Sequence, residues 1–487
     1  MFFIPVDEYE VMSCISSLTT KFSNGPDGLN TYVLKQVAQS VVKPLTVVIN
    51  KSLSSGTMPD SLKIAKVVPI YKKDDTELMC NYRPVSILSP LSKIFEKIVL
   101  KQLDKFASIN NLFFTSQYGF RSGHSTLHAV AELYASLLNS LDNKNIAIGI
   151  FLDMSKAFDT LDHSVLLGKL NFYGIREIPA KWLQNFLSNR KMYVQIGSKS
   201  SFTSDINMGV PQGSILGPWL FNLYINDLCK SLHYGKCILY ADDTTIYLSG
   251  RDYDQLKLQM NIDLDSINKW FNCNRLSLNI KKSCYITFHT RQNKFDDMNN
   301  RNLVIGNEIL NRARFTKFLG LTLDEHLSWK YHIDAVRLSV CKSLYILNTV
   351  KHIFNAKMLR MLYFALVHPH INYGLLLWGF LPSCYFNVIV KMQKRAVRMI
   401  GNARYNSPTG ELFKKYTIPK VETLRSINLL IFMHEVIYNS APSSILNIFT
   451  KKTKNKMYMA ITQDKVTCMS NRETFLYQQI VFYIKVL

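Results

Sequence analysis

Short apolar segments and tight polar turns dominate the centre of the chain. Residues 145–152 are almost continuously apolar, which is the pattern of a buried strand. Residues 237–240 and 244–248 are β-rich runs separated by a short polar turn, which predicts a β-hairpin. Residues 219–232 are apolar again and follow Pro218, which favours a helix with this proline in its first turn.

The segments on either side have mostly helical patterns. Apolar side chains recur at helical spacing in residues 90–106, and residues 126–141 predict a further helix. Residues 145–320 alternate strands and helices, which predicts an antiparallel sheet backed by helices on one face. The chain is therefore expected to have an α+β fold. Its C-terminal part should be helical, with helices at residues 329–347, 356–368 and 386–400.

Acidic residues stand where the predicted strands end. Asp153 follows the buried strand, and Asp242 and Asp243 occupy the tip of the hairpin, directly after Tyr240-Ala241. Neighbouring carboxylates raise each other's pKa unless a cation lies between them, and Mg²⁺ prefers carboxylate oxygens. Three carboxylates from two strands can hold two metal ions, as nucleotidyl transfer requires. A solvated turn and a strand-end cap are the alternatives for these residues.

A glycine-rich loop at residues 208–218 lies between these acidic segments. In combination and order, the motifs resemble the reverse transcriptase of non-LTR (LINE-type) retrotransposons, especially Jockey-like elements of animals. The resemblance covers about residues 23–400. It is carried by residues 153–159, 209–218 and 240–244, with flanking matches at 69–74, 81–86, 117–121 and 318–320 and weaker ones at 378–379 and 393–396.

The resemblance implies a right-hand polymerase fold with fingers, palm and thumb. Residues 1–144 would form an N-terminal extension and the fingers, and residues 145–322 the palm. The whole reverse transcriptase domain would span about residues 55–322. Residues 323–487 would form the helical thumb and C-terminal region.

The same resemblance implies an RNA-directed DNA polymerase. Its partners would be an RNA template, a DNA primer and dNTPs. Asp153, Asp242 and Asp243 would bind two Mg²⁺ ions, with Mn²⁺ as an alternative. One ion would lower the pKa of the primer 3′-hydroxyl, and the other would stabilise the departing pyrophosphate.

Further site residues follow from the resemblance. Arg83 and a neighbouring lysine, Lys73 slightly in preference to Lys72, are expected to bind the triphosphate, since the planar guanidinium of arginine matches phosphate oxygens. A plain surface lysine is the alternative for each lysine. Phe158 is expected to exclude a ribose 2′-hydroxyl, although an ordinary core aromatic is the alternative. Gln212 and Gly213 should lie against the nascent base pair, where glycine permits close backbone approach. Contacts with template or primer are predicted for Gln117, Arg121 and Tyr240.

Composition agrees with a polyanionic partner. The 487 residues include 58 Lys and Arg against 35 Asp and Glu, a formal net charge of +23, although binding to a ribosome or a membrane surface would give the same value. The nine cysteines form no zinc-binding pattern and no evident disulfide framework, which favours an intracellular protein. No apolar stretch is long enough to cross a membrane. The resemblance implies the nucleus without a clear targeting signal, and the oligomeric state is open.

Two alternatives to an active reverse transcriptase remain. One is another palm polymerase that synthesises RNA on RNA, which Tyr240-Ala241 and Phe158 disfavour. The other is an inactive retrotransposon relic that only binds RNA, which the intact set of three carboxylates disfavours. Complete elements of this kind also carry an endonuclease before the polymerase. No room for one exists ahead of residue 23, so the chain is not expected to cut DNA for its own primer.

Overall fold

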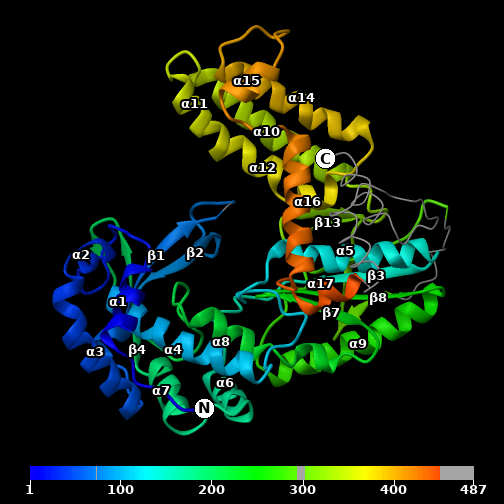
Figure 1. Cartoon of the computed structure of the whole chain (residues 1–487). Coiled ribbons are helices and arrows are strands. Elements are labelled where there is room, and N and C mark those ends of the chain that lie inside the picture. The colour runs from blue at the N-terminus through cyan, green and yellow to red at the C-terminus, as the bar shows by residue number, and fades with distance from the viewer. Residues whose placement is uncertain (73, 293–301, 450–487) are drawn as a thin grey trace.

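The computed structural model describes residues 1–72, 74–292 and 302–449, and Figure 1 shows their arrangement. The N-terminal lobe contains a five-stranded sheet in the order β2-β1-β4-β5, with β6 paired to β4. Strands β1 and β2 are antiparallel, whereas β1 and β4 are parallel. The strands are β1 (Ile64–Tyr71), β2 (Tyr82–Ile87), β4 (Arg190–Ile196), β5 (Lys199–Ser200) and β6 (Ser204–Ile206).

Helices surround this first sheet. The expected helix at residues 90–106 is confirmed as α4, which Ser89 caps by accepting a hydrogen bond from the Leu91 N–H, with Pro90 as the first helical residue. Strand β4 belongs to the segment 145–322 and yet pairs with β1, so this segment contributes to both large sheets. The helices of the lobe are α1 (Glu8–Ser16), α2 (Thr31–Gln36), α3 (Ala38–Ser55), α4 (Pro90–Ile109), α6 (His163–Phe172) and α7 (Glu177–Leu187).

The second or central sheet is formed by strands from the middle of the chain, in the order β12-β9-β3-β8-β7. All its pairs are antiparallel except the edge pair β12–β9, which is parallel. Strand β3 therefore has a hydrogen-bonded neighbour on each side. The strands are β3 (Ile146–Leu152), β7 (Lys236–Tyr240), β8 (Asp243–Gly250), β9 (Cys284–Phe288) and β12 (Asn311–Arg312).

Both faces of this sheet are covered, so the expectation of helices on one face was wrong. Ile148 and Ile150 pack into one core with α8 (Gly217–Tyr224) and α9 (Tyr253–Cys273). Ala147 and Phe151 pack into a second core with α5 (Thr126–Asp142) and the C-terminal helices. Since β3 is buried at every position, it needs a continuous apolar sequence rather than an alternating one.

A helical bundle follows the hairpin β13–β14 and stands above the sheet in Figure 1. The expected helices at 329–347 and 386–400 are confirmed, whereas the one at 356–368 is interrupted by a π-helical turn over Tyr363–Val367. The elements are β13 (Phe315–Phe318), β14 (Leu321–Asp324), α10 (Lys330–Val350), α11 (Ala356–Leu362), α12 (His368–Asn372), α13 (Leu375–Trp378), α14 (Ser383–Ile400) and α15 (Gly410–Lys415). A small separate pair is formed by β10 (Val304–Ile305) and β11 (Glu308–Ile309).

The chain then returns from the bundle to the central sheet. Helices α16 (Val421–Ile437) and α17 (Ser443–Ile448) run back towards α5 (Figure 1). The His128 imidazole of α5 lies 3.1 Å from the Glu435 carboxylate of α16. The Tyr118 hydroxyl bonds to both Glu132 of α5 and Ser444 of α17. The bundle is thus attached to the sheet at its beginning and at its end.

Cys229 and Cys237 are joined as a disulfide with their Cα atoms 5.8 Å apart, a pairing that their sequence spacing did not predict. Among the residues that the structure describes, no helix is both long enough and apolar enough to cross a membrane.

Candidate active site

The hairpin β7–β8 carries the Asp-Asp pair on a two-residue turn. Tyr240 pairs with Asp243, which leaves Ala241 and Asp242 at the tip. Ala241 has φ 52°, a left-handed conformation that is uncommon for a residue other than glycine. Gly119 supports the turn from behind, since a Cβ atom there would lie 2.3 Å from the Ala241 nitrogen. The strained turn is therefore held in place by a closely packed neighbouring segment.

Asp153 reaches the same edge of the sheet from β3. Leu152 pairs with Thr244 in the antiparallel register, so the next residue, Asp153, stands opposite Asp243. The Asp153 N–H donates to Ser283 Oγ at 3.1 Å, and the Asn279 N–H donates to the Asp153 carbonyl at 2.8 Å. Because adjacent strands lie about 5 Å apart, the structure brings the three predicted acidic residues together.

Electrostatics at this edge reflect the crowding of like charges. The Asp243 carboxyl is flanked by protein, and this desolvation, followed by the charges of Asp242 and Asp153, raises its pKa to about 6. Desolvation and the charge of Asp153 also raise the pKa of Asp242. The Lys282 ammonium lies 3.8 Å from the Asp153 carboxylate and offsets part of the repulsion. The site is a concentration of negative charge that favours a cation.

The three carboxylates are suitable ligands for a divalent metal ion, but their side chains are not arranged around a common point. Within residues 1–72, 74–292 and 302–449, no three His, Cys, Asp or Glu side chains stand close enough to form a ready metal site. Carboxylate oxygens are nevertheless the ligands that hard divalent cations prefer. A cation between the carboxylates would also remove the repulsion that raises the pKa of Asp243.

Positive charge faces the acidic turn from the first sheet. Arg83 and Lys72 are exposed residues of the β1–β2 hairpin region. Their positive charges oppose the rise in the pKa of Asp242 but do not cancel it. Ile70 pairs with Arg83, which fixes this arginine on the strand that returns from the hairpin. Lys73, which the resemblance favoured over Lys72, lies outside the described residues. The structure therefore supplies two cations on the far side of the acidic cluster.

The glycine-rich loop is hydrogen-bonded to the turn that follows Asp153. The Val210 N–H donates to the Phe158 carbonyl at 2.8 Å, and the Gly209 N–H donates to the Leu161 carbonyl at 2.7 Å. On its other side, the Ser86 N–H of β2 donates to the Gln212 carbonyl at 2.9 Å. The loop therefore connects the acidic edge of the central sheet to the strand that carries Arg83.

A buried carboxylate holds the far end of this loop. Glu96 of α4 is fully buried and accepts hydrogen bonds from the Ile215 and Leu216 N–H groups at 2.6 and 3.2 Å. Burial raises the pKa of Glu96, while the charge of Arg190 opposes this effect. Glu96 was not among the site residues expected from the sequence. The sequence does contain a signal for it, because Glu96 is an acidic residue on the apolar side of the predicted helix 90–106.

Phe158 belongs to the turn that follows Asp153 and packs against other aromatic rings. Its ring stacks on Phe221 with centroids 4.7 Å apart and meets Phe120 edge-on at 6.5 Å. The side chain is half-buried, so part of the ring remains accessible. This position is compatible both with a steric role towards a nucleotide sugar and with packing.

Comparison with known proteins gives the family. Residues 70–323 match the family model described as reverse transcriptase (RNA-dependent DNA polymerase), which is more than half of the chain. The chain belongs to the reverse transcriptase family. The resemblance that the motifs predicted is thereby confirmed.

The relatives of this reverse transcriptase come from mobile elements. It is 28% identical over 421 residues to the probable RNA-directed DNA polymerase from transposon BS of Drosophila melanogaster, covering 82% of this chain and 45% of that protein. It is 26% identical over 427 residues to the RNA-directed DNA polymerase from mobile element jockey of the same species, covering 85% of this chain and 46% of the relative. The chain thus spans about half the length of these relatives. Apo telomerase from Candida tropicalis aligns over 61% of the chain with 11% identity and a TM-score of 0.37, which is too distant to support an inference.

Two residues predicted to contact the template, Gln117 and Arg121, have hydrogen-bond partners within the protein. Gln117 is fully buried, and its side-chain oxygen accepts a hydrogen bond from the Gly119 N–H at 2.9 Å. With no exposed surface, Gln117 cannot touch a template in this conformation, so that expectation was wrong. Arg121 is half-buried and donates to the carbonyls of Phe114 and Gln117 at 2.9 and 3.1 Å. Both side chains shape the segment that supports the Asp-Asp turn.

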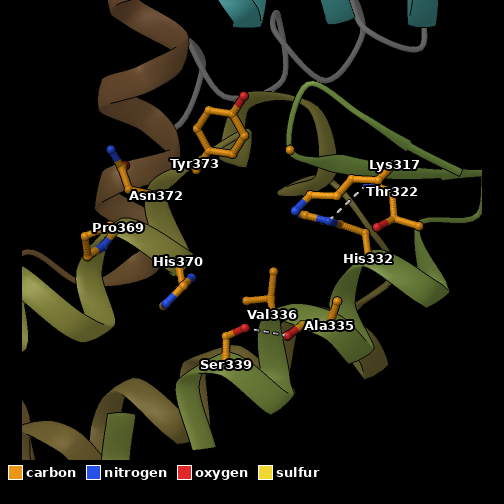
Figure 2. A pocket seen from close by; sticks show the side chains of 11 residues that line it. Lys317, Thr322, His332, Ala335, Val336, Ser339, Pro369, His370, Asn372 and Tyr373 are labelled. Carbon is orange, nitrogen blue, oxygen red and sulfur yellow. Dashed lines mark hydrogen bonds between the residues drawn. The ribbon is translucent and has the colours of Figure 1, made fainter. Parts of the chain in front are cut away.

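A cavity of about 620 Å³ is lined by the β13–β14 hairpin, α10 and the segment around α12. Figure 2 shows Tyr373 and His370 across the cavity from Lys317 and His332. Tyr373 also lies near Tyr240, since its charge contributes to the raised pKa of that half-buried tyrosine. Burial lowers the pKa of His332 to about 4, so this imidazole is neutral at physiological pH. Local sequence patterns do not predict this cavity, because α10, α12 and the β13–β14 hairpin form it jointly.

Proposed function

We propose that this chain extends a primer 3′-hydroxyl with dNTPs on an RNA template, as an RNA-directed DNA polymerase of a mobile element. The observation that carries the proposal is the convergence of Asp153, Asp242 and Asp243 at one sheet edge, opposite the cations Arg83 and Lys72. A negative cluster facing a positive one is what a metal-bound triphosphate requires on its two sides.

Asp153, Asp242 and Asp243 are the residues that would hold the metal. Reverse transcriptases generally use divalent metal ions, and Mg²⁺, with Mn²⁺ as an alternative, is the ion that carboxylate oxygens suit best. When bound, two such ions would activate the primer hydroxyl and neutralise charge on the leaving pyrophosphate. The mutual repulsion of the carboxylates, visible in the raised pKa of Asp243, makes this site more favourable with metal than without it.

The other side chains would position the nucleotide. Arg83 would bind phosphate oxygens through its planar guanidinium, with Lys72 and the adjacent Lys73 contributing charge. Phe158, half-buried beside the loop, would exclude a ribose 2′-hydroxyl. Gly213 would let the loop backbone approach the nascent base pair, since it is exposed and has φ +126°. Tyr240, beside the turn, would contact the primer or template.

Primer extension by the purified chain tests this proposal. The assay contains an RNA template, an annealed DNA primer, dNTPs and Mg²⁺, and compares the wild type with Asp242→Asn. Removing one of the three charged ligands should lower the extension rate by about 100- to 1000-fold. Asp265→Asn is the matched control, because Asp265 is an exposed residue of α9 that pairs with Lys269 at the surface.

The outcomes separate the candidate functions. Extension by the wild type and by Asp265→Asn, with loss in Asp242→Asn, supports a reverse transcriptase. No extension by the wild type, with retained binding of the RNA template, would favour the inactive relic. Extension with rNTPs in preference to dNTPs would favour RNA synthesis. Equal extension by Asp242→Asn and the wild type would overturn the assignment of the site.

A further inference from the structure

Asp159 is an acidic residue of the site region to which the mechanism above gives no part. It follows Phe158 directly, and its side chain is half-buried. The Asp159 N–H donates to the Lys156 carbonyl at 2.8 Å, which closes the turn after Asp153. Both Asp159 carboxylate oxygens accept hydrogen bonds from Gln212 Nε2, at 2.9 and 2.8 Å. These hydrogen bonds connect the turn after Asp153 to the glycine-rich loop.

The chemistry of this contact fixes which way the Gln212 amide faces. An ionised carboxylate can only accept hydrogen bonds, so the amide must turn its NH₂ group towards Asp159. Its carbonyl oxygen then points away from Asp159. Among the described residues, no hydrogen bond to that oxygen is present. Gln212 is thereby left with an acceptor that the protein itself does not use.

The backbone around Gln212 is also fixed. Its carbonyl accepts from the Ser86 N–H at 2.9 Å, and a Cβ atom on the following Gly213 would lie 2.5 Å from the Ser86 carbonyl oxygen. Gly209 is held in the same way, by its N–H bond to Leu161 and by the His163 ring, which lies 2.7 Å from its carbonyl. With the backbone held at both ends, the amide orientation is the remaining freedom of Gln212, and Asp159 determines it.

Desolvation strengthens the contact. Burial raises the pKa of Asp159, whereas the Gln212 hydrogen bond and the charge of Lys156 lower it. A hydrogen bond to a charged, partly buried acceptor contributes more than one between neutral groups. The Gln212–Asp159 contact is therefore one of the stronger links between the loop and the turn that carries Phe158.

We infer that Asp159 is a positioning residue for nucleotide binding, which holds the Gln212 amide so that its carbonyl oxygen faces the incoming nucleotide. This inference rests on the proposed function, because it needs the loop to border the nucleotide site. An incoming nucleotide can use the acceptor through a sugar hydroxyl, since its base donors pair with the template. Phe158 and the oriented Gln212 would then both contact the sugar of the incoming nucleotide.

The inference predicts a change in dNTP affinity without a matching change in turnover. Asp159→Ala removes the orienting acceptor, so the KM for dNTP should rise about tenfold, the factor given by about 1.4 kcal/mol, while kcat changes much less. Asp159→Asn still offers a carbonyl oxygen but permits both amide orientations. Its KM should therefore rise only about twofold, a partial rescue that follows from the two roughly equal orientations.

A double-mutant cycle distinguishes positioning from general stability. In a Gln212→Met background, Asp159→Ala should leave KM unchanged, because the side chain that Asp159 orients is absent. Asp162→Ala is the control on the same turn. Asp162 caps α6 by accepting from the Val165 N–H and pairs with Arg275 at 2.6 Å. Its loss should lower the melting temperature and leave the dNTP KM unchanged.

Single-nucleotide primer extension by the full chain provides the kinetic constants. If the wild type extends primers and Asp159→Ala keeps the wild-type KM, the inference fails while the proposed function stands. Additive effects of Asp159→Ala and Gln212→Met would overturn it equally. If the wild type does not extend primers at all, the proposed function itself has failed. Should Asp159→Ala not fold, Asp159→Asn with and without Gln212→Met carries the same comparison.

Discussion

Gly213→Ala is the sharpest single perturbation of the glycine-rich loop. The residue has φ +126°, a region that residues with a side chain rarely adopt, and the strain costs about 1–3 kcal/mol. A Cβ atom would lie 2.5 Å from the Ser86 carbonyl oxygen, where ordinary contact begins at 3.4 Å. The loop must therefore move by about 0.9 Å, the difference between these distances.

Strand β2 offers no room for this movement. Ser86 pairs with Val67 in the first sheet, and its N–H holds the Gln212 carbonyl. The alanine side chain therefore has to displace the loop rather than the strand. A misplacement of about 1 Å costs about 100-fold in rate, so kcat/KM for dNTP should fall by about this factor. The free energy of unfolding should fall by about 1–3 kcal/mol.

Gly168→Ala is the matched control for this experiment. Gly168 lies inside α6, and a Cβ atom there would meet nothing within 4 Å. The same substitution should therefore raise the free energy of unfolding by about 0.4–1 kcal/mol and leave extension unchanged. Single-nucleotide primer extension and urea denaturation measure both quantities. A Gly213→Ala variant with wild-type kcat/KM would show that the loop does not border the nucleotide.

Two further predictions concern sugar selection and the metal. Phe158→Ala should raise rNTP incorporation relative to dNTP by about tenfold or more, whereas Phe172→Ala, at an exposed ring, should not; unchanged selectivity would leave Phe158 as a packing residue. The folded-state pKa of Asp243, about 6, exceeds its ordinary value of 3.8. Between these two pH values, the Asp243 carboxyl is therefore protonated in the metal-free folded chain and ionised in the unfolded chain. Stability should fall as pH rises through the window from 3.8 to about 6, and Mg²⁺ should raise the melting temperature more at neutral pH than near pH 5. Equal Mg²⁺ effects at both pH values, or in Asp243→Asn, would contradict this reasoning.

Local patterns were sufficient to predict the acidic edge of the central sheet. A buried strand that ends in Asp153 and a hairpin with Asp242 at its tip are each encoded within a few residues. Their convergence follows from the pairing of β3 with β8. Local sequence does not encode the parallel pairing of β1 with β4, because more than 100 residues separate these strands.

Side-chain direction was the other limit of the sequence analysis. Gln117 has the polar character expected of a template contact, yet the structure uses its amide to support a turn. Glu96 was overlooked because its partners, Ile215 and Leu216, are 119 and 120 residues away in sequence.

The double attachment of the helical bundle restricts how it can move. A body fixed at one point can swing in any direction, whereas one fixed at two points can only rotate about the line that joins them. The return through α16 and α17 supplies the second hinge, at the His128–Glu435 and Tyr118–Ser444 contacts. The Tyr118 backbone N–H also donates to the Leu239 carbonyl of the β7–β8 hairpin, at 2.8 Å. Opening of the bundle would therefore pull on the strand that presents the acidic turn. Under the proposed function, contact with the template–primer duplex and the geometry of the acidic turn would change together.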